Sequence, residues 1–286
     1  MAEPPAPIDA LLPREIAHRA EEIGIKKALL DLPSMFMLAV LAGAFVAVGG
    51  VFSTVAATGL SDGLPYGMTR ILSGLVFCLG LILIVLAGAE LFTGNTLIVM
   101  AWASRKVSTA ALLRNWLVVY MGNLAGSLAT AALVFLAGQH TFAGGLIGRT
   151  MLSIANAKVN LDFVPAVALG ILCNGLVCLA VWLTIGARTT TDKILAILFP
   201  ITAFSASGFE HSIANMYFIA IGLLVKQFDP DFAARAASDA NLDLSNLTFA
   251  GFWDNLIPVT IGNIIGGVVL VAAVYWFIYL RPAKQA

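Results

Sequence analysis

Two stretches of the chain, GAELFTGN (residues 88–95) and GFEHSIAN (residues 208–215), share the pattern G-x-E-x-x-x-x-N inside otherwise apolar sequence. A second shared pattern, N-x6-G-N-x-x-G, begins at Asn115 and again at Asn255. Because both patterns recur in the same order, the chain carries an internal duplication.

The sequence around these motifs is strongly apolar. Of the 286 residues, 60% are hydrophobic and 11% are charged, and the mean hydropathy is +0.94, whereas soluble domains have roughly 45–50% apolar residues. A membrane span needs about 20 such residues in a row. The sequence therefore predicts an all-α membrane protein with six transmembrane helices, at residues 34–58, 71–89, 115–139, 163–187, 194–225 and 255–280.

The duplication predicts how these spans are arranged. Each copy holds three spans, an odd number, so the second copy crosses the membrane in the opposite sense and the architecture is an inverted 3+3 repeat. We expect a cytoplasmic amphipathic helix region at 1–33, a channel domain at 34–280 with repeats 34–140 and 163–280, and a cytoplasmic tail at 281–286.

The first motif of each copy lies in the middle of an overlong span. The second apolar run continues past Glu90 through residues 91–104, and the fifth covers residues 194–225. Glycines there favour a break in the helix, and irregular backbone at membrane depth must be buried in protein or line a wet cavity. Buried polar groups in a membrane are costly unless they are paired. We therefore predict breaks at Gly88, Gly94 and Gly208, with the freed backbone groups satisfied by Glu90, Glu210, Asn95 and Asn215.

The two copies differ at the centre of the motif. When they are aligned on their glutamates, Leu91 lies opposite His211 and Thr93 lies opposite Ile213. The scaffold is duplicated but the imidazole is not. An ionisable group at the bilayer midplane is a functional-site hypothesis by default, and His211 is therefore our main candidate for function.

The remaining polar features are less specific. Residues 14–30 can form an amphipathic helix, which would dock on the body, lie along the membrane or cover a pore mouth. Counting lysine and arginine places both termini in the cytoplasm, because eleven of these residues then fall on the inside and five on the outside. The three cysteines and three histidines suggest neither a disulfide framework nor a metal centre, and we expect no cofactor.

Five longer stretches resemble the formate/nitrite transporter family over essentially the whole chain: AGAELFTGNTLIV, NWLVVYMGNLAGSL, ILCNGLVCLAVWL, SGFEHSIANM and DNLIPVTIGNIIGG. The phrase FEHSIANM and the long segment 227–253 favour the formate branch, with a nitrite-preferring channel as the alternative. The resemblance implies an aquaporin-like protomer in a homopentamer of the cell inner membrane. It also implies pore gates at Phe77, Leu81 and Phe204, and a polar substrate pathway along His211, Thr93, Asn174, Glu210 and Lys158.

The substrate expected from this resemblance is a small monovalent anion, formate first and possibly nitrite, acetate or hydrosulfide. We hypothesise that His211 lends a proton, so that the substrate crosses the apolar gates as a neutral acid. A pore for neutral solutes such as glycerol is a rival reading, but the paired N-P-A loops of aquaporins do not occur. An enzyme using Glu210 and His211 is a second rival, which lacks a visible nucleophile or cofactor loop.

Overall fold

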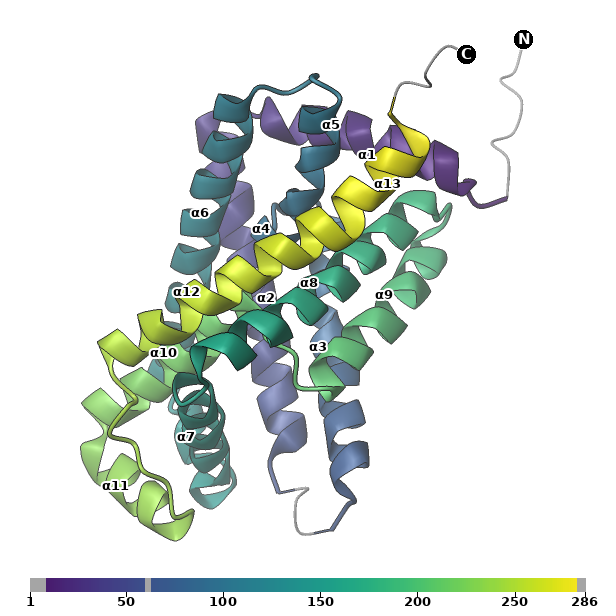
Figure 1. Ribbon diagram of the computed structural model, residues 1–286. Coiled ribbons are helices and arrows are strands. Elements are labelled where there is room, and N and C mark those ends of the chain that lie inside the picture. The colour runs from purple at the N-terminus through teal and green to yellow at the C-terminus, as the bar shows by residue number, and fades with distance from the viewer. Residues whose placement is uncertain (1–8, 60–62, 282–286) are drawn as a thin grey trace, which may run out of the picture.

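The structure is a computed structural model that describes residues 9–59 and 63–281, and within them the chain folds as a bundle of helices (Figure 1). Of the predicted cytoplasmic regions at 1–33 and 281–286, residues 1–8 and 282–286 lie outside the described residues. The elements are α1 (Pro13–Ala28), α2 (Leu32–Ala57), α3 (Tyr66–Ala87), α4 (Phe92–Asn95), η2 (Thr96–Ile98), α5 (Val99–Ala103), α6 (Thr109–Leu136), η3 (Gln139–Thr141), η4 (Ala143–Gly145), α7 (Leu146–Val159), α8 (Phe163–Gly186), α9 (Thr190–Ala206), α10 (Ser212–Phe228), α11 (Pro230–Asp239), α12 (Phe249–Ile265), the π-helical segment η5 (Gly266–Ala273) and α13 (Val274–Tyr279).

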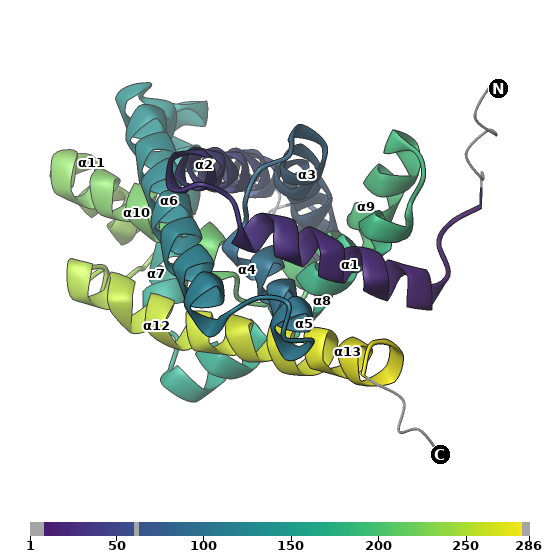
Figure 2. The same cartoon turned by 90° about the horizontal axis from the view of Figure 1, so that it is seen from above.

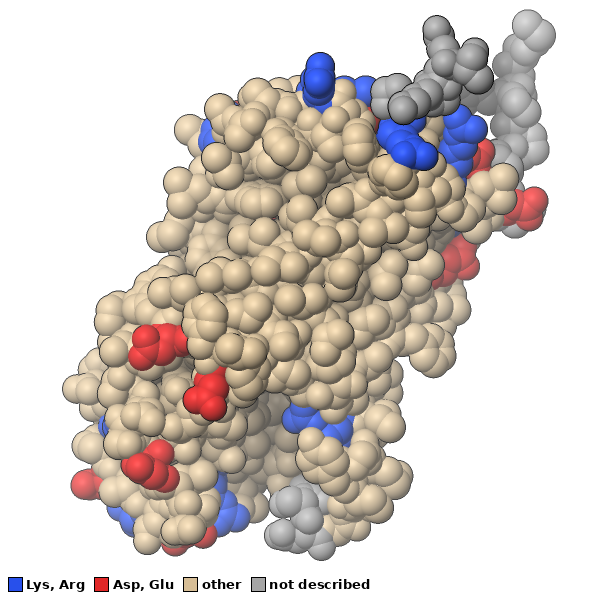
Figure 3. Space-filling model, viewed as in Figure 1, with Lys and Arg blue, Asp and Glu red and all other residues tan. Residues whose placement is uncertain are grey.

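Five helices of the described chain are long and apolar enough to cross a membrane: α2, α3, α6, α8 and the continuous helix Phe249–Tyr279. The remaining predicted span is divided between α9 and α10, which have 17 residues each. On the face shown in Figure 3, charged side chains gather toward the two ends of the molecule, and a band of uncharged residues lies between them. The prediction of a multi-pass, all-helical membrane protein is confirmed.

Both overlong spans are broken, as predicted. Gly88 ends α3 and Gly208 follows the end of α9, and both have positive φ angles, +82° and +75°, which a glycine adopts without strain. The prediction for Gly94 is wrong, because this glycine lies inside the short helix α4. The break after α3 therefore needs only one glycine.

The glycines of the second motif allow close helix packing in both repeats. A Cβ atom on Gly126 of α6 would lie 2.0 Å from the Val40 carbonyl oxygen of α2, and one on Gly266 would lie 2.2 Å from the Ile171 carbonyl oxygen of α8. Neither position can hold a larger residue without moving the helices apart, as in other G-x-x-x-G pairs. The repeated glycines of the second motif therefore serve the close packing of α6 on α2 and of the last span on α8.

Helix α1 lies across one end of the bundle, against η2, α5 and α8 (Figure 2). Arg114 donates hydrogen bonds to the carbonyl oxygens of Ala28 and Leu30, and Lys106 forms an ion pair with Glu21. The next helix begins at the exposed Asp31, whose carboxylate accepts the Ser34 N–H, and this bond lowers the pKa of Asp31. The predicted amphipathic helix is thus docked on the transmembrane body through its middle and its C-terminal end.

Candidate functional site

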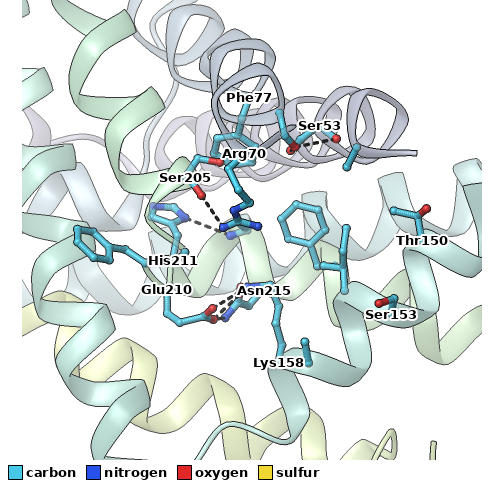
Figure 4. A pocket seen from close by; sticks show the side chains of 18 of the residues that line it. Ser53, Arg70, Phe77, Thr150, Ser153, Lys158, Ser205, Glu210, His211 and Asn215 are labelled. Atoms are coloured by element: carbon cyan, nitrogen blue, oxygen red, sulfur yellow. Dashed lines mark hydrogen bonds and ion pairs between the residues drawn. The ribbon is translucent and has the colours of Figure 1, made fainter. Parts of the chain in front are cut away.

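Two hollows enter the bundle from opposite ends. The larger one, about 570 Å³, opens beside α7 and is called the α7 vestibule; its lining includes Arg70, Phe77, Arg149, Lys158, Phe204, Glu210 and His211 (Figure 4). The smaller one, about 340 Å³, opens beneath α1 and is called the α1 vestibule; its lining includes Arg19, Lys27, Leu81, Glu90, Leu91 and Lys193. Helix α3 runs past both, with Phe77 in one vestibule and Leu81 in the other.

The three residues expected as gates lie between these vestibules. Phe77, Leu81 and Phe204 are 6%, 5% and 4% exposed, and the rings of Phe77 and Phe204 meet edge to face with centroids 5.7 Å apart. Leu81 follows Phe77 by one helical turn on the same face of α3. The structure therefore brings Phe77 and Phe204 together and places Leu81 one turn further along α3, and we call this apolar region between the vestibules the constriction.

His211 occupies the end of this constriction nearest Phe204, with the two rings stacked at 6.0 Å. Its Nδ1 atom accepts the backbone N–H of Ala214 at 3.1 Å and so caps the start of α10. Because an accepting nitrogen carries no proton, the neutral ring holds its proton on Nε2. That nitrogen lies 2.9 Å from the Thr93 hydroxyl, which is the acceptor of the bond.

This imidazole–hydroxyl pair takes one residue from each repeat. Thr93 follows the first break and His211 follows the second, and both side chains are buried. The positions that correspond to them in the other copy hold Ile213 and Leu91, which are also buried but apolar. The polar pair is therefore formed only once, although the positions that could form it are duplicated.

The backbone at each break is held by an asparagine from the next span. The Asn263 Oδ1 atom accepts the Ser212 N–H at 2.9 Å, and its Nδ2 atom donates to the Gly170 and Glu210 carbonyl oxygens. Asn123 makes the same three bonds in the first repeat, to the Phe92 N–H and to the carbonyl oxygens of Ala39 and Glu90. These two asparagines therefore hydrogen-bond across helices in both repeats, and the two sets of bonds are equivalent.

The glutamates and the other asparagines act differently from our expectation. The Glu210 carboxylate accepts a hydrogen bond from the Asn215 amide at 2.6 Å and binds Lys158 at 3.0 Å, and the Asn215 amide also donates to Asn255. In the first repeat, Glu90 binds Asn95 and Lys27, and Asn95 donates to Asn115. These contacts join side chains across each break. The freed backbone is instead satisfied by Asn123 and Asn263, which corrects the role expected for Glu90, Glu210, Asn95 and Asn215.

The repeat is longer than the predicted boundaries 34–140 and 163–280. Asn115 donates to the backbone carbonyl of Lys27 at the end of α1, and Asn255 donates to that of Lys158 at the end of α7. Helices α1 and α7 therefore occupy equivalent positions in the two repeats. The signal was present in the sequence, because KALLD (residues 27–31) and KVNLD (residues 158–162) share the pattern K-x-x-L-D.

Asn174 does not line either vestibule. Its buried amide donates to the backbone carbonyl oxygens of Asn263 and Thr93, at 2.7 and 3.2 Å. It thus lies behind Thr93 and orients the segment that carries the hydroxyl, whereas the resemblance placed it on the substrate pathway. Sequence reasoning did not single out Lys27 as a vestibule residue, and it gave no role to Arg70.

An all-helical inverted repeat, with cationic vestibules at both ends and a short apolar constriction between them, defines a membrane channel or transporter. A family model described as formate/nitrite transporter matches residues 14–277. The chain belongs to the formate/nitrite transporter family.

Known proteins similar to this chain carry related names. The formate channel FocA of Escherichia coli (strain K12) is 47% identical over 277 residues, which cover 96% of each chain. FocA of Haemophilus influenzae is 41% identical and covers 92% of each chain. A solved structure described as a pentameric formate channel with formate bound superposes with a TM-score of 0.80 at 44% identity, covering 87% of this chain and 98% of its own. A structure described as an FNT family ion channel gives a TM-score of 0.78 at 29% identity, with 92% and 98% covered.

Proposed function

We propose that each chain conducts formate and related small monovalent anions between its two vestibules. In this proposal the chains form a homopentamer in the cytoplasmic membrane, and both termini of each chain lie in the cytoplasm. The observation that carries the proposal is the apolar constriction of Phe77, Leu81 and Phe204, which holds one polar pair between two basic vestibules. The names of the relatives support formate as the substrate, and the pentameric neighbour supports the assembly.

The vestibules are suited to collecting anions. Three cationic side chains and one carboxylate line the α7 vestibule, Arg70, Arg149 and Lys158 with Glu210. Three cations and one carboxylate also line the α1 vestibule, Arg19, Lys27 and Lys193 with Glu90. An excess of positive charge in a cleft with low-dielectric walls raises the local concentration of anions, and added salt weakens the effect.

The constriction opposes a bare anion. Transfer of a carboxylate into such a site costs several kcal/mol even after relaxation. Protonation of the substrate removes this cost, although proton transfer from an imidazolium to a simple carboxylate in water is uphill by roughly 3.5 kcal/mol. In a dry site the transfer converts two buried charges into two neutral groups, which offsets that penalty.

The geometry of His211 specifies what proton donation requires. The neutral ring already has its proton on Nε2, so the imidazolium forms only when a second proton reaches Nδ1. That atom accepts the Ala214 N–H, and protonation therefore breaks the cap of α10, at a cost of about 1–3 kcal/mol for the unpaired donor. We propose that His211 is charged only transiently, while an anion lies beside it.

The experiment is formate uptake into proteoliposomes as a function of pH, for wild type, His211→Asn and His18→Asn. Asparagine is a good N-cap, so His211→Asn keeps the start of α10 and removes only the titrating ring. His18 is exposed on α1 and provides the matched control. We expect wild type and His18→Asn to transport faster as the pH falls, and His211→Asn to lose this dependence. An unchanged pH profile in His211→Asn contradicts the proton-donor role.

The same vesicles separate the alternatives. Nitrite and formate are compared side by side, since a higher nitrite flux favours the nitrite-preferring channel. Rapid glycerol flux without formate flux supports a pore for neutral solutes and refutes the proposed function.

A further inference from the structure

Arg70 is a cationic residue of the α7 vestibule that the expected substrate pathway does not include. It lies on α3, and its guanidinium reaches across to the end of α9, where Nη2 donates to the Ser205 carbonyl oxygen at 2.8 Å and Nε donates to that of Ala206 at 3.1 Å (Figure 4). The group also packs over the second break, since a Cβ atom on Gly208 would lie 3.3 Å from Nη2. Two carbonyl bonds thus fix the plane of this guanidinium beside the constriction.

A guanidinium has two edges that can each bind a pair of oxygen atoms. The carbonyl bonds of Arg70 occupy the edge formed by Nε and Nη2. The other edge, formed by Nη1 and the second hydrogen of Nη2, makes no hydrogen bond to the described residues and belongs to a side chain that lines the vestibule. Two parallel N–H groups held in one plane match the two oxygens of a carboxylate.

The neighbouring cation is less suited to this task. The Lys158 ammonium donates to both oxygens of Glu210 at 3.0 Å, and its side chain is 14% exposed. Its charge is therefore largely balanced where it lies. No carboxylate among the described residues forms an ion pair with Arg70.

We propose that Arg70 is a carboxylate-docking residue of the α7 vestibule, which binds the substrate through its Nη1–Nη2 edge before the substrate enters the constriction beside Phe204. The proposal rests on the proposed function and adds to it a preference for planar anions with two oxygens. Because the same guanidinium binds the last turn of α9, the docked anion lies next to Ser205, the residue that follows the gate residue Phe204. A spherical or single-atom anion gains only the charge of the site and not its two parallel donors.

The test compares Arg70→Lys with Arg149→Gln in proteoliposomes containing the full chain, with formate and hydrosulfide as substrates. Lysine keeps the charge but not the edge, so the half-saturating formate concentration rises about tenfold, the effect of losing one charge-assisted hydrogen bond. The value for hydrosulfide, which has no pair of oxygens, stays within about twofold because the charge is retained. Arg149→Gln removes a charge from the same vestibule and shifts both anions by a similar factor.

Equal shifts for formate and hydrosulfide in Arg70→Lys overturn the docking proposal. A wild-type protein that conducts hydrosulfide but not formate refutes formate as the substrate and the docking proposal with it. Formate conduction with equal shifts refutes the docking proposal alone. Gel filtration shows whether each variant assembles.

A second measurement uses only the wild-type protein and so does not depend on the folding of a variant. Acetate and chloride are added as competitors of formate uptake at matched ionic strength. Acetate inhibits at a lower concentration than chloride if a carboxylate edge is present, and equal inhibition overturns the proposal.

Discussion

The amides of Asn123 and Asn263 allow a test in which the larger substitution does more harm than the smaller one. Both side chains are fully buried, and each holds one N–H and one carbonyl oxygen at a helix break and a second carbonyl oxygen on a neighbouring helix. Leucine has the same branched shape as asparagine and a larger volume, but it offers no polar atom, so it leaves the Ser212 N–H and the Glu210 carbonyl without a partner. At about 1–3 kcal/mol for each group, Asn263→Leu lowers the free energy of unfolding by roughly 2–6 kcal/mol.

Alanine leaves a polar space where the amide was. A water molecule that enters can bond the same N–H and carbonyl groups, and it recovers part of the loss. We therefore expect Asn263→Ala to be less destabilising than Asn263→Leu, and the same order for Asn123→Ala and Asn123→Leu. A core position at which cavity formation sets the cost shows the reverse order, because the smaller residue leaves the larger cavity.

The assay is thermal unfolding of the purified protein in detergent, at one scan rate because unfolding of such a protein is kinetically controlled. Asn160→Ala, at the exposed end of α7, is the control for a lost surface amide. If alanine lowers the unfolding temperature more than leucine at both positions, the reasoning from hydrogen bonds is refuted and packing determines the cost.

Two further predictions concern the support of the pathway. Gly267→Ala would place a Cβ atom 2.1 Å from the Thr96 hydroxyl and 2.5 Å from the Asn174 amide, so we expect formate uptake to fall at least about tenfold. The control is Gly175→Ala, whose Cβ atom would have a side-chain methyl group at 3.9 Å as its nearest neighbour and should leave uptake unchanged. Equal uptake in the two variants argues against a role for Asn174 in placing Thr93. Glu210→Gln should destabilise the protein more than Glu90→Gln, because Lys158 is 14% exposed and Lys27 is 28% exposed; removing one partner of a buried pair costs about 3–5 kcal/mol, and solvent screens the more exposed pair. Thermal unfolding in low and high salt measures the difference, and a larger loss for Glu90→Gln contradicts it.

Much of the architecture could be predicted because it depends on local patterns. Apolar runs indicate the spans, Gly88 and Gly208 mark the breaks through their backbone freedom, and the repeated N-x6-G-N-x-x-G pattern indicates where helices pack closely. The cross-helix bonds of Asn123 and Asn263 follow from the same pattern, since a buried amide beside a packing glycine must find partners on the neighbouring helix.

The parts that could not be predicted depend on which elements meet in space. Asn174 is polar and buried in either role, and only the tertiary structure shows that its amide supports Thr93 from behind. Arg70 lies near the start of a span, where a cation is ordinary, and its partners are more than a hundred residues away in sequence. The equivalence of Lys27 and Lys158 was detectable through the pattern K-x-x-L-D, but three matching residues are weak evidence alone. The structure supplies the stronger evidence, because Asn115 and Asn255 donate to the backbone carbonyl groups of Lys27 and Lys158, respectively.

The pairing of Thr93 with His211 bears on why the two halves belong to one chain. A twofold assembly of identical half-length chains must place every residue twice, so it would hold either two imidazoles at its centre or none. Joining the halves covalently permits an odd number, and the corresponding positions hold Leu91 in the first copy and Ile213 in the second. Exact twofold symmetry does not allow a single titrating group in the middle of a narrow path. Fusion of the two copies into one chain allows the two positions to differ, and so allows one histidine.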